Sequence, residues 1–417
     1  MLSPLNYRIG FFLAIRQIRR ASLWTTGLII FVMVLTFLNL VVVSGILVGL
    51  IQGSINAWRS EYTSDVIIST LDDKKYIENS TNLLELIKSI PGIESVSARY
   101  SEGGTLEANY KTRKDTDKAN VAAAQIFGIN PSDEQSATGL GDKIFEGSYL
   151  TSGDYDKVLL GYFLLSQYVP VDDPNLAALK NVGVGDKIRI NVNGVIREVT
   201  VKGIIKSKVD GLTRNAFMLD SQFRSMIGRN DGNVDQIVMK LSPHADPINV
   251  RDALTLHGVD QYAKVQTYAD AQPKFLKDII NTFNMLGAAF GSIGLIVASI
   301  TIFIVVFINA LTRRKYIGIM KGIGIHGRAV EISYVFQSAF YALFGSGIGL
   351  VLLYGLLVPA FIAHPIDFPF SDGILVAPLS DTLFRVGLLV FATLVAGYIP
   401  AWMIIRKNTL DSILGRN

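Results

Sequence analysis

Residues 27–50 read GLIIFVMVLTFLNLVVVSGILVGL, and only Thr36, Asn39 and Ser44 among them carry a polar side chain. The stretch without Asp, Glu, Lys or Arg is longer and covers residues 21–58. Each large apolar side chain near the bilayer centre favours insertion by about 0.3 to 0.6 kcal/mol. The sequence therefore predicts a first membrane span, which is too long for the apolar core of a cleavable signal peptide.

Three further charge-free runs follow, at residues 279–312, 332–363 and 386–405. The last holds 20 uncharged residues, and a helix of that length spans about 30 Å, the thickness of the hydrocarbon core. Only 18% of the 417 residues are charged, against about 25% in a soluble domain. We therefore expect four spans. The grouping of apolar residues into long charge-free runs excludes a wholly soluble enzyme. The chain has no cysteine, which excludes disulfides, thiolate metal sites and cysteine nucleophiles.

The basic residues near the spans predict the orientation of the chain, because Lys and Arg concentrate in cytoplasmic loops. They fall before the first span, between the second and third, and after the fourth; they are Arg8, Arg16, Arg19, Arg20, Arg313, Arg314, Lys315, Lys321, Arg328, Arg406, Lys407 and Arg416. The loop between the third and fourth spans instead carries Asp367, Asp372 and Asp381. Both termini and the loop at 313–331 are therefore predicted to be cytoplasmic. The net charge of +4 then reflects topology, and we expect no nucleic acid partner.

The residues between the first two spans, 59–278, have an ordinary soluble composition and are predicted to lie outside. Residues 187–192 and 195–207 flank Asn193-Gly194, a dipeptide typical of a hairpin turn, and Asp246-Pro247 is a typical helix start. The predicted fold is an α-helical membrane protein with four transmembrane helices and a mixed α+β extracytoplasmic domain inserted between helices 1 and 2.

The predicted segments have these boundaries: an N-terminal amphipathic cytoplasmic helix at 1–22, the first span and stalk at 23–58, the extracytoplasmic domain at 59–278, a stalk and second span at 279–312, a cytoplasmic coupling loop at 313–331, the third span at 332–362, an extracytoplasmic loop at 363–384, the fourth span at 385–405 and a cytoplasmic tail at 406–417. As helices, the uncharged runs around the first two spans would measure about 57 and 51 Å, more than a bilayer needs. The excess is either a helical stalk or an uncharged linker, and the sequence leaves both open.

A helix over residues 7–20 would have a basic side and an apolar side. Arg8, Arg16 and Arg19 fall on the first, and Phe11, Ile15 and Ile18 on the second. Such a helix can lie along the inner leaflet with its basic side toward anionic headgroups, which makes membrane lipid an expected partner.

Glycines recur every four residues along three of the spans. This spacing lets helix backbones approach closely in lipid, where van der Waals contact drives association. It predicts a packed bundle, shared between protomers. The predicted packing residues are Gly45, Gly49, Gly53, Gly287, Gly291, Gly345 and Gly349.

Motifs for chemistry are missing from the sequence. The glycines of residues 322–327 match G-x-G-x-x-G, but they lie in a short basic loop between two spans rather than in a βαβ unit. The phosphate cradle G-x-x-x-x-G-K-[ST] does not occur, no G-x-S-x-G is found, and the four histidines have no ligand spacing. None of the four charge-free runs contains an Asp, Glu, Lys or Arg residue, which argues against a proton relay inside the spans. We therefore expect no enzyme activity, cofactor or metal in this chain.

Three groups of motifs, in order along the chain, resemble one family of membrane proteins. PGIESV at 91–96, FGINP at 127–131, VLLG at 158–161 and VGVGD at 182–186 resemble the periplasmic core domain of MacB-type permeases. RRKYIGIMKGIG at 313–324, followed by Gln337-Ser338 and the glycines 345, 347 and 349, is similar to the C-terminal domain of FtsX-like ABC transporter permeases. So is Pro400-Ala-Trp with LDSIL at 410–414. Tyr316 and Gln337 stand where that family usually has Glu, and Thr409 where it has Pro.

The resemblance implies a permease subunit that has no ATPase site of its own. A separate cytoplasmic ATPase would hold ATP and Mg, dock on the loop at 313–331 and move the helices. The stalk would then transmit that motion to the outside domain. The resemblance also implies that the chain lies in the inner membrane of the cell. Further implied partners are a second permease copy or a sibling permease, and a periplasmic adaptor. The residues implied to couple ATPase and permease are Arg313, Arg314, Lys315, Gly318, Lys321, Gly322, Gly324, His326 and Arg328.

Other functions stay open at this point. A non-transporting FtsX-like regulator whose outside domain controls a partner such as a wall hydrolase has the same order of spans, although typically with a smaller outside domain. A membrane enzyme is a weaker alternative. The substrate of a transporter of this type can be a lipoprotein, a lipid, a peptide or a macrolide, and the sequence does not select among them.

Overall fold

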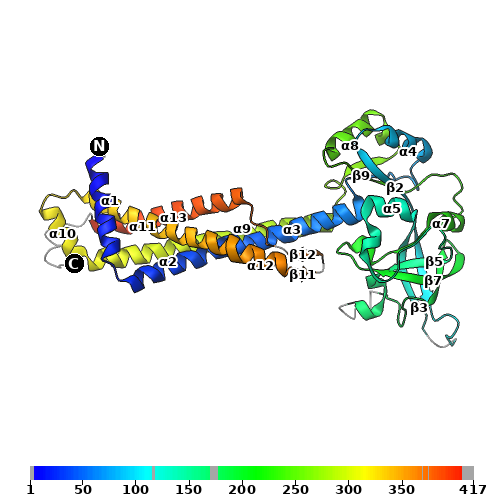
Figure 1. The fold of residues 1–417 in the computed structure, drawn as a ribbon, viewed down its shortest axis with the longest axis horizontal. Coiled ribbons are helices and arrows are strands. Elements are labelled where there is room, and N and C mark those ends of the chain that lie inside the picture. The colour runs from blue at the N-terminus through cyan, green and yellow to red at the C-terminus, as the bar shows by residue number, and fades with distance from the viewer. Residues whose placement is uncertain (1–3, 115–117, 170–176, 369, 374, 406–417) are drawn as a thin grey trace. The chain divides into compact units, whose positions relative to one another are not determined.

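The computed structural model describes residues 4–114, 118–169, 177–368, 370–373 and 375–405. The chain forms two compact units. The membrane unit contains Met1–Ile51, Asp278–Asp367 and Gly373–Asn417, and the sheet unit contains Gln52–Lys277 and Phe368–Asp372. The boundary between the units falls inside two helices, α3 (Ser44–Trp58) and α9 (Lys274–Thr312), which are found by their labels in Figure 1.

Four helices in the described part of the chain are long and apolar enough to cross a membrane. The first is an unbroken helix of 41 residues, Leu23–Thr63, and α9 has 39 residues. The third has 37 residues, Gly327–Ala363, and the fourth runs over Leu379–Met403. At 1.5 Å per residue the first two measure about 60 Å, twice the hydrocarbon thickness. The uncharged flanks of these spans are therefore helical, which excludes an irregular linker there.

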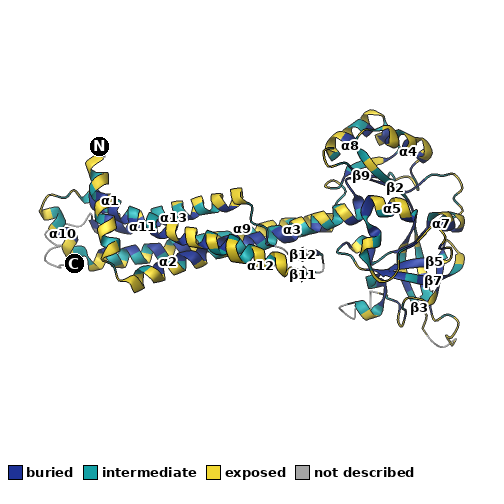
Figure 2. Ribbon diagram, in the orientation of Figure 1, coloured by how far each residue is buried: buried dark blue, intermediate teal, exposed yellow. Residues whose placement is uncertain are grey.

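The membrane unit contains the following elements: α1 (Pro4–Arg19), α2 (Leu23–Leu38), the π-helical turn η1 (Asn39–Val43), the first half of α3, most of α9, α10 (Arg314–Gly322), α11 (Gly327–Leu352), the π-helical turn η7 (Leu353–Leu357), α12 (Val358–Ala363) and α13 (Leu379–Ile405). Helix α11 packs against α1, α2 and α13. Large side chains that are fully buried in this unit include Met33, Phe37, Tyr334 and Tyr341. The outward faces of the helices stay exposed, as Figure 2 shows, and many of the exposed side chains there are large and apolar, which suits lipid contact.

One charged residue lies deeper in its helix than the sequence predicts. Arg385 was expected to bracket the fourth span, but α13 begins at Leu379, so Arg385 lies in its second turn. Its Nη1 donates to the carbonyl oxygen of Leu40, 3.3 Å away, and to Oγ of Ser44, 3.0 Å away. Leu40 belongs to the π-helical turn η1, where the regular hydrogen-bond ladder is interrupted. Helix α11 likewise begins before the predicted third span and contains Glu331. Both helices therefore extend beyond the charge-free runs, and the absence of ionisable residues inside the spans stays a prediction.

The glycines of α11 lie where other side chains leave no room. A Cβ atom at Gly345 would clash with Met33 of α2, and one at Gly349 with the ring of Phe37. Gly397 of α13, which the spacing argument did not identify, is equally close to Ser338. Small residues therefore let α11 approach both α2 and α13 closely.

Of the predicted packing glycines in the first two spans, some lie in close contacts and others do not. A Cβ atom at Gly45 would lie 2.9 Å from the carbonyl oxygen of Val376. At Gly287 and Gly291 it would make ordinary contacts, 3.5 Å from Leu47 and 3.6 Å from Leu40. Gly49 is buried and Gly53 half-buried. Close packing inside the protomer therefore requires glycine at 45, but not at 287 or 291.

The sheet unit is built on a mixed sheet of ten strands. The strands are β1 (Val66–Ser69), β2 (Ile93–Ala108), β3 (Asn120–Ile129), β4 (Ile144–Gly147), β5 (Lys157–Gly161), β6 (Lys187–Val192), β7 (Val195–Ile205), β8 (Ala216–Leu219), β9 (Gln236–Leu241) and β10 (Lys264–Thr267). Their order is β10-β1-β9-β2-β3-β8-β5-β7-β4, with β6 paired to β2 and β7. The helices are α4 (Ser80–Ser89), α5 (Pro131–Thr138), α6 (Asp210–Thr213), α7 (Asp220–Met226) and α8 (Pro247–Leu256). Short strands β11 (Ile366–Phe368) and β12 (Ser371–Gly373) pair separately.

Local sequence signals explain several of these elements. The predicted hairpin is confirmed: β6 and β7 pair with Val192 opposite Val195, and Asn193 and Gly194 have φ of 51° and 85°. The predicted helix start is also confirmed, because the Asp246 carboxylate accepts a hydrogen bond from the Ile248 N–H at 3.0 Å.

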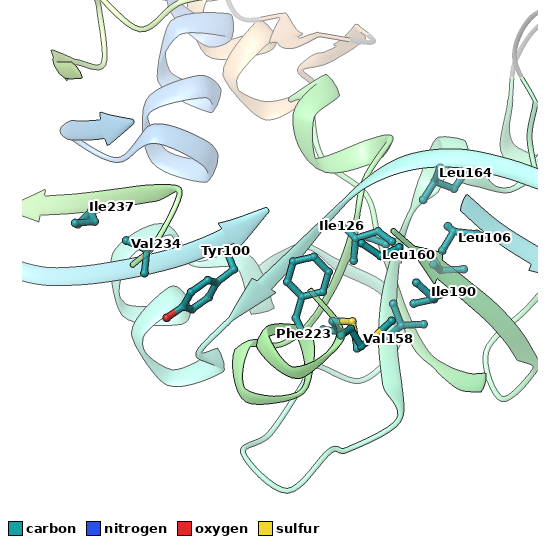
Figure 3. Close-up of a cluster of buried hydrophobic side chains, with 14 of the residues drawn as sticks. Tyr100, Leu106, Ile126, Val158, Leu160, Leu164, Ile190, Phe223, Val234 and Ile237 are labelled. Carbon is teal, nitrogen blue, oxygen red and sulfur yellow. The ribbon is translucent and has the colours of Figure 1, made fainter. Parts of the chain in front are cut away.

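The core of the sheet unit is a cluster of fully buried aliphatic and aromatic side chains, several of which are drawn in Figure 3. It includes Leu106, Ile126, Leu160, Ile190 and Phe223. Gly128 on β3 lies against the Phe223 ring and leaves no room for a Cβ atom. Close packing of this kind makes the interior of the sheet unit resist deformation.

Candidate functional site

A short helix between the second and third spans forms the first part of the candidate site. Helix α9 ends at Thr312, α10 covers Arg314–Gly322, and α11 begins at Gly327. Gly324 between them has a φ of +96°, a conformation that side chains with a Cβ atom rarely adopt. The segment is thus a helix between two turns, with a glycine required at the second.

Helix α10 is amphipathic and keeps part of its apolar surface exposed. Ile317 and Gly318 are buried on one side. Tyr316 is 68% exposed, Ile319 45% and Ile323 74%. These three residues follow the spacing i, i+3, i+7 and so share one face of a helix. The residues predicted from the sequence in this segment were basic residues, glycines and a histidine. The apolar stripe was not predicted, although its spacing is visible in the sequence.

The predicted coupling residues have different surroundings. Lys315, Gly322, Gly324, His326 and Arg328 are exposed, while Arg313, Arg314 and Lys321 are half-buried. Nζ of Lys321 donates to the carbonyl oxygen of Ile405 at the end of α13, 2.9 Å away. Nδ1 of His326 accepts from the Arg328 N–H at 3.2 Å and caps α11. Lys321 and His326 therefore fix the segment, and the exposed residues are available to a partner.

Helix α1 braces the same end of the membrane unit. Its buried residues are Gly10 and Ala14, and a Cβ atom at Gly10 would lie 2.9 Å from the Ala329 carbonyl oxygen of α11. Nε2 of Gln337 donates to Oε1 of Gln17 at 2.7 Å. Helix α1 is thus docked on α11 by its small residues, and Phe12, 60% exposed, stays on an outer side.

The second part of the candidate site lies in the sheet unit, where both long helices enter the sheet. The first helix ends with the π-helical turn η2 (Arg59–Thr63), and β1 begins three residues later. Strand β1 pairs with β10, which precedes α9, with Val66 opposite Thr267. Nε of Arg59 donates to Oδ1 of Asp65 at 2.7 Å, and its guanidinium lies 4.6 Å from the Tyr268 ring centre. The two helices therefore enter the sheet unit on neighbouring strands that Arg59 links.

A buried ion pair holds the end of the first helix. Arg99 on β2 and Glu134 on α5 are each 1% exposed, with Nη2 of Arg99 2.6 Å from Oε1 of Glu134. The same Nη2 donates to the Tyr62 carbonyl oxygen at 2.9 Å. Burial by itself would raise the pKa of Glu134, but the Arg99 charge and hydrogen bonds from Arg99, Thr138 and Ser97 outweigh it and lower that pKa. The pair is therefore charged and rigidly bonded to the helix end.

Further contacts tie the helix and a distant segment into this unit. Glu61, 6% exposed, accepts from Nζ of Lys143 at 2.8 Å. The short segment Phe368–Asp372, which lies between the third and fourth spans in the chain, belongs to the sheet unit. The carbonyl oxygen of Phe368 accepts from Nζ of Lys208 at 2.7 Å, and that of Phe370 from Oγ of Ser54 at 3.2 Å. The end of the first helix and the segment between the third and fourth spans are thus both held in the sheet unit by side-chain contacts.

Sequence reasoning did not identify Arg99, Glu134 or Glu61, because nothing local distinguishes them from the many surface charges of a soluble domain. Among the described residues, no group of three or more His, Asp or Glu side chains is placed to hold a metal ion.

Two family profiles match the chain. The profile described as MacB-like periplasmic core domain matches residues 26–256, more than half of the chain. The profile described as FtsX-like permease C-terminal matches residues 288–409.

Two curated relatives are similar over most of their length. An uncharacterised ABC transporter permease of Methanocaldococcus jannaschii is 24% identical over 342 residues, which cover 80% of this chain and 78% of that protein. The lipoprotein-releasing system transmembrane protein LolC of Neisseria meningitidis is 24% identical over 351 residues, which cover 76% of each chain.

Two solved structures resemble about half of the chain. The periplasmic region of MacB from Actinobacillus actinomycetemcomitans has a TM-score of 0.34 and 17% identity, covering 51% of this chain and 92% of that one. The extracellular domain of the transporter YknZ from Gram-positive bacteria has a TM-score of 0.32 and 14% identity, covering 49% and 99%.

Proposed function

This chain belongs to the ABC transporter permeases that join a MacB-like periplasmic core domain to an FtsX-like C-terminal domain, and from that premise we propose that it works by mechanotransmission. ATP hydrolysis by a separate cytoplasmic subunit moves the membrane helices, and the helices move the sheet unit on the far side of the membrane. The sheet unit then drives export or release of an amphipathic substrate.

The observation that carries this proposal is the pair of helices of 41 and 39 residues that end on neighbouring strands of the sheet unit. A continuous helix transmits displacement along its axis because every turn is hydrogen-bonded to the next. Its end is held by the Arg99–Glu134 pair and by Glu61, so a pull on the helix also acts on β2 and α5. These contacts support a mechanical link without any transmembrane pore.

The docking site for the ATPase is proposed to be α10 and the turn after it. Exposed Tyr316, Ile319 and Ile323 offer an apolar contact, and Lys315 adds a positive charge beside it. An exposed apolar stripe outside the spans is typical of a protein interface. The basic residues at this end also support a cytoplasmic orientation for it and for both termini, with the sheet unit outside.

The substrate and the further partners belong to the same proposal. The name of the Neisseria relative refers to lipoprotein release, and at 24% identity it supports only the class of amphipathic substrates, which includes lipoprotein, lipid, peptide and macrolide-like molecules. We further propose that the unit of function contains a second permease, either a copy or a sibling, and that a periplasmic adaptor can join it.

The test uses the chain reconstituted in liposomes with its ATPase. We expect the double variant R313E/R314E to lose most of the permease-stimulated ATP hydrolysis, because Arg313 precedes α10 and Arg314 is its first residue, so both charges lie at the start of the proposed docking helix. G324A should also uncouple, since its φ of +96° is unfavourable for a residue with a Cβ atom. The matched control is G322A: it too has open space around its Cβ position, but no positive φ.

Stimulated turnover that is unchanged in R313E/R314E and G324A would contradict the docking proposal. The non-transporting alternative makes a different prediction in the same assay. A regulator of a wall hydrolase would keep ATP-dependent coupling in the wild type, yet release no amphipathic substrate under any condition.

A further inference from the structure

A cavity of about 780 Å³ lies at the basic end of the membrane unit, among α1, α11 and α13. These three helices meet at one end of the unit in Figure 1. The volume is within the range of sites that hold small molecules, about 300 to 1,000 Å³. Because the cavity is bordered only by helices of a membrane unit, its occupant has to be compatible with lipid.

The lining of the cavity is graded in polarity along α11. Arg328 and Glu331 lie in the first turn and a half of that helix, and Val335 and Ala339 follow on the same side. From Arg328 to Ala339 the helix rises about 16 Å. The wall is therefore charged at one end and apolar for the rest, which matches a headgroup followed by an acyl chain.

The charges at the polar end are of both signs. Arg328 is exposed and Glu331 half-buried, and within the described residues the structure records no ion pair or side-chain hydrogen bond for either. A guanidinium binds a phosphate by charge-assisted hydrogen bonds, and a carboxylate binds an ammonium group in the same way. A ligand with a phosphate and an amine therefore satisfies both side chains, whereas a purely anionic headgroup leaves Glu331 facing negative charge.

Two tyrosines line the same cavity at different levels. Tyr7 of α1 and Tyr398 of α13 are 45% and 44% exposed and line the cavity. Tyrosines with an apolar ring and a wet hydroxyl are enriched at the level of lipid headgroups. Tyr7 lies one turn before Gly10, which packs against Ala329 and Ile332, so its position agrees with a headgroup at the Arg328 end. Tyr398 follows Gly397, which packs against Ser338, and therefore borders the apolar end.

We propose that this cavity binds one zwitterionic phospholipid, with its phosphate on Arg328, its ammonium group on Glu331 and one acyl chain against α11. The lipid bridges α1, α11 and α13. The inference rests on the chain being a membrane permease and does not depend on the proposed coupling to an ATPase.

The test measures lipid retention by the full chain in native mass spectrometry, without any ATPase. The probes are phosphatidylethanolamine and phosphatidylglycerol with matched acyl chains. We expect the wild type to prefer phosphatidylethanolamine by about tenfold, since only that headgroup pairs with Glu331. E331Q should retain both lipids equally, R328Q should retain less of each, and A339W should retain less of each because the indole occupies part of the apolar end of the cavity. K264Q, which removes an exposed positive charge of the sheet unit, should behave as the wild type.

Three results would overturn the proposal. The first is equal retention of both lipids by the wild type and E331Q. The second is wild-type retention by A339W. The third is lipid binding only after deletion of residues 406–417, or only in monomers, because the tail or a second copy would then be the natural occupant. A loss of ATPase coupling in these variants would have no bearing on the lipid result.

Discussion

At the scale of single residues, Arg99 and Glu134 of the sheet unit form an ion pair that water does not reach. Removing both charges together is often tolerated in a protein, but removing one leaves the other buried and uncompensated. Arg99 also donates to the Tyr62 carbonyl oxygen, so the pair fixes the end of the first long helix. We interpret the pair as a rigid joint rather than as a source of net stability.

Replacing Glu134 by glutamine should lower the free energy of unfolding of the sheet unit by about 3 to 5 kcal/mol at pH 7. The pKa of Glu134 is lowered in the folded chain, so its stabilisation is fully present above the ordinary carboxyl value of about 4.3 and is lost as the pH falls through the lowered pKa. The difference between E134Q and the wild type should therefore shrink below about pH 4. Urea unfolding followed by Trp58 fluorescence, with Trp24 and Trp402 changed to phenylalanine, measures it. A constant difference between pH 7 and pH 3 would contradict this account.

At the scale of elements, the contact between α2 and α11 depends on Gly345 and Gly349 of α11, which both face α2. Gly345 lies against Met33, and its neighbour two residues on, Gly347, has open space around its Cβ position. Gly345 and Gly347 belong to the same helix and differ only in what surrounds them. They therefore separate the effect of packing from the general effect of a glycine on a helix.

G345A should destabilise the membrane unit by about 1 to 3 kcal/mol, because the added methyl group overpacks a closed contact. G347A should be neutral or stabilising, since alanine favours helix more than glycine does. Thermal unfolding of both variants in detergent gives the comparison. If the two variants melt at the same temperature, the close approach of α2 and α11 is not a determinant of stability.

The sequence predicted these elements as far as local signals extend. The four spans follow from charge-free runs, and the β6–β7 hairpin follows from Asn193-Gly194. Helix ends were missed where a charged residue finds a specific partner. Arg385 lies inside α13 because Leu40 and Ser44 accept its hydrogen bonds, and no scan for charge-free windows can anticipate that contact.

The candidate site was predictable only in part, for a related reason. The segment at 313–331 is contiguous, so its basic residues and glycines could be proposed as coupling residues from the sequence alone, and that role stays a prediction. The joint of Tyr62, Arg99 and Glu134 brings together residues that are far apart in the chain, and β1 finds its partners β9 and β10 about 170 to 200 residues away. Pairings at that separation are set by the whole sheet and leave no local pattern.

At the scale of the whole molecule, the central claim is that a change at the ATPase end reaches the sheet unit. Along the chain, one continuous helix, Leu23–Thr63, leads into the sheet unit, and another, Lys274–Thr312, leads out of it toward α10. A bend or break in either helix would absorb the motion, and the backbone stays helical through the π-helical turn η1. Transmission is therefore a property of the assembled chain and has to be measured on it.

The most direct measurement is hydrogen–deuterium exchange of the reconstituted ATPase–permease complex, trapped with ATP and then without nucleotide. We predict that amide exchange changes several-fold between the two states at residues 59–68 and 264–268, where the helices join β1 and β10, as well as at α10. Exchange that changes at α10 but is identical in both states at 59–68 and 264–268 would contradict mechanotransmission through these helices.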